Sequence, residues 1–318
     1  RRSLHRVLQM GQPLPGGRWF FQHGPMDCVI GADGQACAVA QALEAAWARF
    51  QGVLTELVAE LGLLRMNLAA VPGHSVAASG PVAQRMVAAC RPYAAQGQFI
   101  TAMAAVAGSV AQELIGHFQL PGVQRAYVNN GGDIALHLAP GQAFEIGLVM
   151  DPRHAVLGID GRFRIDAASG VRGIATSGWR GRSLSLGIAD SVTVLAETAA
   201  QADAAATMLG NAVNVDDARI VRAAANSVRD DSDLGQLLVT LGVPALPAPQ
   251  VALALASGAA LAGREIGAGR ILAAALCLQG QMRQVASQVF HGSRRGLVGP
   301  ILRHAPTLQS EHPACTEA

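Results

Sequence analysis

Residues 127–138 read YVNNGGDIALHL, and this stretch decides how the fold is interpreted. Its apolar beginning and its alternating end are typical of two β-strands, and Gly131-Gly132 between them indicates a tight hairpin turn. The same glycines can adopt positive φ angles and expose backbone N–H groups to a ligand, with Asp133 beside them as an acceptor. A hairpin turn and a ligand-facing loop are both open from these residues alone.

The composition favours one large folded domain. The chain has 318 residues, of which 51% are hydrophobic and 14% are charged, and its formal net charge is +2. This is enough apolar sequence for a large core, and we expect a single domain over residues 1–290. Residues 291–318 are rich in Pro, Gly and polar residues and are expected to form a loosely held tail. No basic stripe with interleaved aromatic residues is present, so nucleic acid is not an expected partner.

The sequence contains no lysine, and all 24 positively charged side chains are arginines. This excludes enzymes that form a Schiff base through lysine, pyridoxal phosphate enzymes, and P-loop enzymes with a phosphate-binding lysine. A phosphate bound by this chain must be held by arginine, by backbone N–H groups or by a metal.

The cysteines and the apolar runs indicate the compartment. The five cysteines form no CxxC pair and are odd in number, which is typical of reduced thiols in the cytosol. No apolar run reaches the roughly 18 residues of a membrane span. The first residues lack the apolar segment of a signal peptide. We therefore expect a cytoplasmic protein with no membrane partner.

Hydrophobic periodicity predicts a mixture of helices and strands. Helices are expected over residues 37–64, 81–93, 99–114, 199–213, 251–260 and 271–289, with a helix and a loop over 216–235. Strands are expected over 18–31, 126–138, 144–149 and 191–196, a meander over 151–170, and a loop over 173–178. This mixture indicates layers of the α+β or α/β type.

The loop GIATSGWRGR offers a candidate anion site. Thr176, Ser177 and Gly178 supply hydroxyl and N–H groups, and Arg180 and Arg182 follow at once. Guanidinium groups match the geometry of phosphate. The alternative is a solvated loop that carries surface arginines.

The helix over 199–213 carries a candidate metal site. Asp203 and Thr207 are four residues apart and therefore share one helix face. A carboxylate and a hydroxyl suit Mg²⁺ or Ca²⁺ better than zinc, but backbone carbonyls or water must complete the shell. The alternative is a solvent-facing Asp and a Thr bonded to its own helix. No GxSxG, HExxH or GxGxxG motif is present, and the histidines are not spaced as metal ligands, so hydrolase, zincin and Rossmann interpretations lack support.

Taken in order, these motifs resemble the ApbE-like superfamily, which includes the magnesium-dependent FAD:protein FMN transferases. The order is MAAVAG (103–108), NGGDI (130–134), ATSG (175–178), SVTVLA (191–196) and ADAAAT (202–207). The resemblance covers residues 18–285 and extends to SDLG (232–235) and LQG (278–280). It is greatest to a branch of uncharacterised bacterial and archaeal proteins. It implies an α+β fold with two interleaved lobes and a ligand cleft between them.

The resemblance also implies site residues. Asp203 and Thr207 match the metal-binding side chains of the transferases, and Ala107 matches the residue whose carbonyl completes that site, so Mg²⁺ or Ca²⁺ is an expected cofactor. FAD or FMN is the expected ligand, and its predicted binding residues are Asn130, Gly131, Gly132, Asp133, Thr176, Ser177, Gly178, Arg180 and Arg182.

The chain departs from its branch at one place and from the transferases at two. Gly108 stands where they carry a Lys, their His-Ile-Ile-Asp-Pro segment is missing, and Arg182 replaces a His that is usual in the branch. Four interpretations are therefore open: a flavin-nucleotide transferase, a ligand-binding protein without transfer activity, an enzyme acting on another phosphorylated or acidic metabolite, and a structural protein. In the last case the small-residue helices would pack tightly or form the interface of a homo-oligomer.

Overall fold

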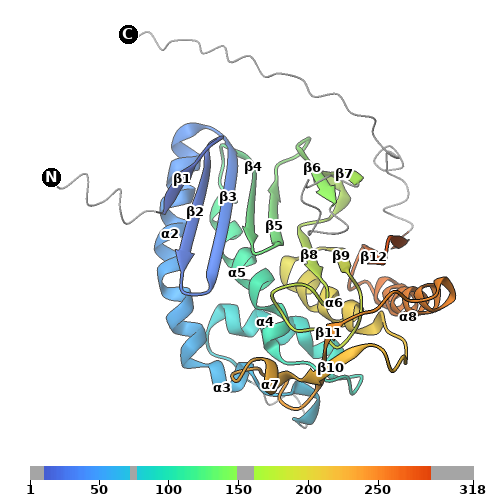
Figure 1. The fold of residues 1–318 in the computed structure, drawn as a ribbon. Coiled ribbons are helices and arrows are strands. Elements are labelled where there is room, and N and C mark those ends of the chain that lie inside the picture. The colour runs from blue at the N-terminus through green and yellow to red at the C-terminus, as the bar shows by residue number, and fades with distance from the viewer. Residues whose placement is uncertain (1–10, 72–76, 149–160, 288–318) are drawn as a thin grey trace, which may run out of the picture.

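The structure is a computed structural model that describes residues 11–71, 77–148 and 161–287 (Figure 1). Its largest element is a nine-stranded sheet in the order β1-β2-β3-β4-β5-β8-β9-β12-β13, in which every neighbouring pair is antiparallel. The strands are β1 Gln12–Leu14, β2 Arg18–His23, β3 Met26–Gly34, β4 Val123–Asn130, β5 Asp133–Leu138, β8 Gly173–Ser177, β9 Ser191–Ala196, β12 Ala273–Leu278 and β13 Gln281–Ala286. Both halves of the chain contribute to this one sheet.

Helices lie along one face of the sheet, so the α+β class expected from the sequence is confirmed (Figure 1). The α-helices are α2 Ala36–Ala59, α3 Leu61–Leu64, α4 Pro81–Ala94, α5 Val106–Ile115, α6 Ala199–Ala212, α7 Ala225–Val228 and α8 Ala248–Gly267. Short 3₁₀ helices are η1 Leu68–Ala70, η2 Ala102–Ala105, η3 Gly116–Phe118 and η4 Ala167–Ser169. Helix α2 packs on β2 and β3, α5 on β4 and β5, α6 on β8 and β9, and α8 on β12 and β13.

The two faces of the sheet bury different clusters. In β4, Ala126 and Val128 point into the main core beneath the helices, whereas Tyr127 contacts a smaller cluster on the opposite face. This is the alternation that a strand covered on both sides requires. The smaller cluster is covered by the hairpin of β6 (Ala143–Leu148) and β7 (Gly161–Asp166), from which Ile165 is fully buried.

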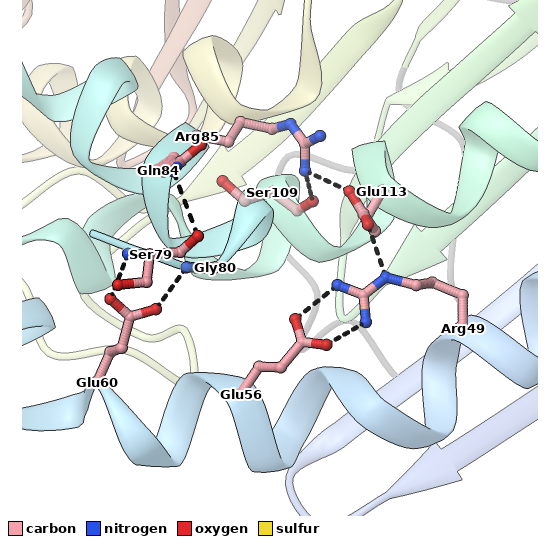
Figure 2. Close-up of polar contacts among 9 residues, drawn as sticks. All are labelled: Arg49, Glu56, Glu60, Ser79, Gly80, Gln84, Arg85, Ser109 and Glu113. Carbon is pink, nitrogen blue, oxygen red and sulfur yellow. Dashed lines mark hydrogen bonds and ion pairs between the residues drawn. The ribbon is translucent and has the colours of Figure 1, made fainter. Parts of the chain in front are cut away.

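A network of charged side chains joins helices α2, α4 and α5 (Figure 2). Arg49 donates through two nitrogens to Glu56, both at 2.7 Å, and through Nε to Glu113, also at 2.7 Å. Arg85 lies 3.0 Å from Glu113 and donates to the carbonyl of Ser109. Because Glu113 has two guanidinium partners, it fixes α5 against α2 and α4.

A second contact in Figure 2 places the start of α4. The Glu60 carboxylate, at the end of α2, accepts the backbone N–H groups of Ser79 and Gly80, each at 2.7 Å. These groups precede Pro81 at the first position of α4, where the helix dipole favours a negative charge.

The structure corrects four expectations about secondary structure. The expected helix at 271–289 is wrong, because its described part forms β12 and β13. The expected loop at 173–178 is mostly strand β8. The expected helix at 99–114 begins only at Val106, after η2, and the region 216–235 contains strand β10 (Val221–Ala224) before the short α7. Strand β10 pairs with β11 (Leu238–Gly242) as a separate two-stranded sheet. For β8 and β12, pairing with strands elsewhere in the sequence determines the outcome.

Among the helices of the described residues, none is long and apolar enough to cross a membrane. In the same part of the chain, Cys28, Cys37, Cys90 and Cys277 form no disulfide bond. The predicted tail at 291–318 and the first half of the predicted meander at 151–170 lie outside the described residues.

Candidate functional site

The stretch YVNNGGDIALHL forms the hairpin of β4 and β5. Asn130 pairs with Asp133, and Gly131 and Gly132 make the two-residue turn with φ angles of 67° and 115°. The side chain of Asn129 accepts the N–H of Gly132 at 2.8 Å and stabilises the turn. Positive φ at both central positions explains the Gly-Gly pair, and the hairpin interpretation is confirmed.

A cavity of about 480 Å³ lies beside this turn. It is lined by residues from all three candidate sites of the sequence: the Gly-Gly turn, the TSG segment and the metal site. These residues come from four separate parts of the chain. From the predicted sets, it is lined by Ala107, Asn130, Gly131, Asp133, Thr176, Ser177, Gly178, Arg182, Asp203 and Thr207. Gly132 and Arg180 do not line it. We refer to this space as the polar cavity.

Asp203 and Thr207 reach the polar cavity from α6, whose neighbouring residues Ala202, Ala204, Ala205 and Ala206 are buried. The Asp203 carboxylate accepts the backbone N–H of Gly108 at 2.8 Å, and the N–H of Ala107 also hydrogen-bonds to it. Burial raises the pKa of Asp203 well above its usual value, and the charge of Asp133 raises it further, while the two N–H groups act in the opposite direction.

Helices α5 and α6 approach each other so closely at Gly108 that a side chain there would force them to shift. A Cβ atom built on Gly108 would lie 2.3 Å from the backbone oxygen of Ala199 and 2.9 Å from Cβ of Asp203. Helices α5 and α6 are therefore in backbone contact here. This contact places the backbone N–H of Gly108 against the Asp203 carboxylate.

Asp133 faces Asp203 from the start of β5. One oxygen accepts the backbone N–H of Thr176 at 3.2 Å. Burial raises the pKa of Asp133 to about 7, although this N–H and the charge of Arg182 oppose the shift. The hairpin and α6 thus bring two carboxyl groups into one cavity, close enough for the charge of Asp133 to raise the pKa of Asp203.

Asn130 connects the hairpin to α5. Its side chain is 4% exposed and donates through Nδ2 to the carbonyl oxygen of Ala107 at 3.2 Å. The carbonyl predicted to be a metal ligand is therefore held at the cavity by the residue that precedes the Gly-Gly turn.

Two arginines have different environments in the TSG loop, the connection from Gly178 to Asp190 between β8 and β9. Arg182 lines the polar cavity, lies against Gly131, and is 3.8 Å from Asp27. Arg180 stacks over the ring of Trp179 at 4.3 Å and pairs with Asp190 at 3.2 Å. Of the two, Arg182 alone is available at the cavity, while Arg180 stabilises the loop.

The LQG motif has a structural explanation. Gln279 donates its backbone N–H to Asp190 at 2.6 Å, and its side-chain amide bonds the backbone of Pro244 and Leu246. Asp190 therefore joins the turn between β12 and β13 to the loop that carries Arg180. This motif supports the site without lining it.

The cavity also contains residues that the sequence analysis did not assign. Thr101 donates its hydroxyl to Asp233, Arg65 pairs with Asp231 at 3.1 Å, and Arg229 donates to a backbone carbonyl of the TSG loop. Asp233 belongs to the SDLG motif. Because this motif is one of those that resemble the ApbE-like superfamily in order, the sequence could have assigned it to the site. Arg65 and Thr101 carried no local signal.

Apolar side chains form another part of the wall. Phe99, Met103, Leu184 and Met208 line the same cavity as the carboxylates. A cavity with apolar walls and a few convergent polar groups is the usual form of a small-molecule site, and such sites measure about 300–1,000 Å³. Within the described part of the chain, no group of three or more His, Cys, Asp or Glu side chains could hold a metal ion.

Comparisons with known proteins give distant relatives. The chain is 38% identical over 150 residues to a UPF0280 protein of Methanopyrus kandleri, covering 47% of this chain and 56% of that protein. It is 37% identical over 140 residues to a UPF0280 protein of Methanothermobacter thermautotrophicus, covering 44% and 51%. The chain therefore spans about half the length of the curated relatives it matches.

Among solved structures, the chain is similar to the apo form of the flavinyl transferase ApbE of Pseudomonas stutzeri, with 14% identity, a TM-score of 0.48, and coverage of 86% of this chain and 95% of that one. It is also similar to the flavin transferase ApbE of Vibrio cholerae, with 13% identity, a TM-score of 0.37, and coverage of 86% and 98%. The sequence model of the family described as AbpE bacteria matches residues 10–284. That match spans most of the 318 residues, so the chain belongs to this family, the bacterial ApbE-like branch that the ordered motifs resemble.

Proposed function

We propose that this protein binds a flavin nucleotide such as FAD or FMN, or a similar phosphorylated nucleotide, together with a divalent metal in the polar cavity. One observation carries the proposal. The cavity gathers oxygen donors, an arginine and apolar side chains from segments that are far apart in the sequence. These are the three kinds of group that a metal, a phosphate and a planar ring require.

The donor set fits Mg²⁺ or Ca²⁺. The Asp203 carboxylate, the Thr207 hydroxyl and the Ala107 carbonyl are oxygen donors, which hard divalent cations prefer. The Asn130 side-chain amide holds the Ala107 carbonyl at the cavity. Asp133 adds negative charge nearby. A bound cation would neutralise these carboxylates and the diphosphate of the ligand.

The remaining groups fit the organic part of the ligand. Arg182 offers a guanidinium to phosphate, and Thr176 and Ser177 at the end of β8, with Gly178, add hydroxyl and N–H groups. Phe99 and Met208 offer apolar contact to a ring system.

Within this proposal, the activity is that of a flavin-nucleotide transferase. The metal would stabilise charge on the departing AMP, and the residues of the chain would hold and orient the diphosphate. Family membership and the ordered motifs support this activity.

The test is calorimetric titration of the full chain with FAD, with and without Mg²⁺. We expect Mg²⁺-dependent binding that is lost in Asp203→Ala. The exposed Asp230, which does not line the cavity, gives a matched control as Asp230→Ala. If FAD binds equally with and without Mg²⁺, or if both variants behave alike, the metal site is refuted.

A second candidate, a ligand-binding protein without transfer activity, is favoured by Gly108. The backbone contact at Gly108 excludes the amine that the transferases carry there. Release of AMP from FAD and Mg²⁺ separates the two candidates. Binding without AMP release under any acceptor condition would identify the ligand-binding protein.

A further inference from the structure

We infer that Asp233 is a further ligand-binding residue of the polar cavity, where its carboxylate accepts a hydrogen bond from a hydroxyl or N–H group of the bound molecule. The inference rests on the proposed function, because it concerns the same cavity. It assigns a role to the SDLG motif, which neither the metal site nor the phosphate site uses. Ser232, Asp233 and Leu234 of this motif all line the cavity.

The carboxylate is held in place by a buried partner. Thr101 is 3% exposed, lines the cavity immediately before η2, and donates its hydroxyl proton to Oδ2 of Asp233. A threonine hydroxyl has one proton, so this donation fixes its orientation. An ionised carboxylate has about four acceptor positions, and Thr101 fills one of them. Asp233 is therefore an oriented acceptor with remaining capacity at the cavity.

The charges around Asp233 indicate which part of a ligand it meets. Asp231, two residues earlier, pairs with Arg65, and Arg182 lies on the hairpin side of the cavity against Gly131. A carboxylate repels phosphate, so the phosphate end of a ligand belongs with Arg182 and the metal donors. Asp233 then meets an uncharged part that carries a donor. The ligand class is a phosphorylated molecule with a sugar or polyol hydroxyl, or a ring N–H, remote from its phosphate.

The segment around Asp233 depends on polar contacts for its position. Between Ala225 and Val239, none of residues 226–238 is buried. Two contacts hold the segment in place: Asp231 forms an ion pair with Arg65, and Arg229 donates a hydrogen bond to the carbonyl of Arg182. Thr101 comes from a rigid, buried position and is therefore the positioning residue for Asp233.

The test uses the full chain with Mg²⁺, two probes and two variants. Asp233→Asn is isosteric and can still accept from Thr101, but it replaces the free acceptor with a donor. Asp230→Asn removes an exposed carboxylate from the same segment and is the matched control. FAD carries both donors and phosphate, whereas inorganic pyrophosphate at pH 8 reports on the metal and phosphate part alone.

We expect Asp233→Asn to bind FAD roughly 10- to 100-fold more weakly, the loss expected for a hydrogen bond to a charged group. Pyrophosphate affinity should stay within about twofold, and Asp230→Asn should match the wild type for both probes. Thr101→Val should weaken FAD binding less than Asp233→Asn, because the carboxylate is still present.

Two results would overturn the inference while the proposed function stands. One is unchanged FAD affinity in Asp233→Asn, and the other is an equal loss for FAD and pyrophosphate, which would make Asp233 a general support of the cavity. A wild-type protein that binds neither probe would refute the proposed function itself, and the inference with it.

Discussion

Replacing Gly108 by alanine tests the contact between α5 and α6 that shapes the candidate metal site. The added Cβ would lie 2.3 Å from the Ala199 oxygen, whereas ordinary contact begins at 3.4 Å. The two helices must therefore separate by about 1 Å. The same movement lengthens the 2.8 Å hydrogen bond from the Gly108 N–H to Asp203.

The expected cost follows from these changes. Overpacking in a tight core costs about 1–3 kcal/mol, and a weakened hydrogen bond to a carboxylate adds about 1–2 kcal/mol. Alanine recovers about 1 kcal/mol of helix propensity relative to glycine. We therefore expect Gly108→Ala to lower the free energy of unfolding by about 1–4 kcal/mol.

The assay is urea unfolding at 25 °C, followed by tryptophan fluorescence, with and without Mg²⁺. Gly263 in α8 is the control, because a Cβ there would meet nothing within 4 Å. Gly263→Ala should raise the free energy of unfolding by up to about 1 kcal/mol. Mg²⁺ should stabilise the wild type more than Gly108→Ala. Equal stability of the two alanine variants would refute the backbone contact and the account of the missing lysine.

Three further substitutions separate structural from ligand-facing charges. Glu113→Gln should lower the free energy of unfolding by about 1–2 kcal/mol at pH 7, because it weakens charged hydrogen bonds from Arg49 and Arg85. Burial alone would raise the pKa of Glu113, but its bonds to these arginines lower it below 4.5, so this stabilisation exists above pH 4.5 and is lost as the pH falls through the lowered pKa. Urea titrations of both proteins from pH 7 to 3 should converge at low pH, and a constant difference would contradict the assignment. Arg182→Ala should weaken FAD binding with Mg²⁺ about tenfold, whereas Arg180→Ala should leave it within about twofold and lower stability instead. Equal losses of affinity in calorimetry would contradict the placement of the two arginines.

Local sequence was sufficient to predict those features whose conformation depends only on residues nearby in the chain. The Gly-Gly pair between alternating strands predicts the β4–β5 hairpin, and positive φ angles at both glycines confirm the turn. Spacing by four predicts that Asp203 and Thr207 share a face of α6, and both line the cavity. Each of these features is fixed by residues within one turn of helix or one hairpin.

Local sequence was insufficient where distant partners decide the conformation. The run from Ile271 to Leu278 is rich in Ala and Leu, which favour a helix, yet it forms β12 because β9 and β13 pair with it on both sides. The loop expected at 173–178 is strand β8 for the same reason, since β5 and β9 flank it. Tertiary pairing outweighs intrinsic propensity at both places.

The polar cavity required the order of the motifs as well as their content. Thr101 and Asp233 lie 132 residues apart, and no local pattern joins them. The position of SDLG in the ordered series was the one signal that the segment belongs to the site. The sequence alone shows that glycine stands at position 108, where the resemblance implies a lysine. The hydrogen bond from the Gly108 N–H to Asp203 depends on how closely α5 and α6 approach each other, which the sequence does not show.

The Gly-Gly turn shows why the two interpretations of residues 127–138 are compatible. Gly131 has a φ of 67°, which the turn requires, and a Cβ on it would lie 2.0 Å from Nη2 of Arg182. The same missing side chain therefore permits the turn and admits the guanidinium. Asp133 follows at once and accepts a backbone N–H from β8, so the turn also delivers a carboxylate to the cavity. A side chain at position 131 would be strained by the positive φ and would push aside the flexible end of Arg182. The turn therefore sets the requirement for glycine, and the space that the glycine leaves beside it admits the guanidinium to the cavity.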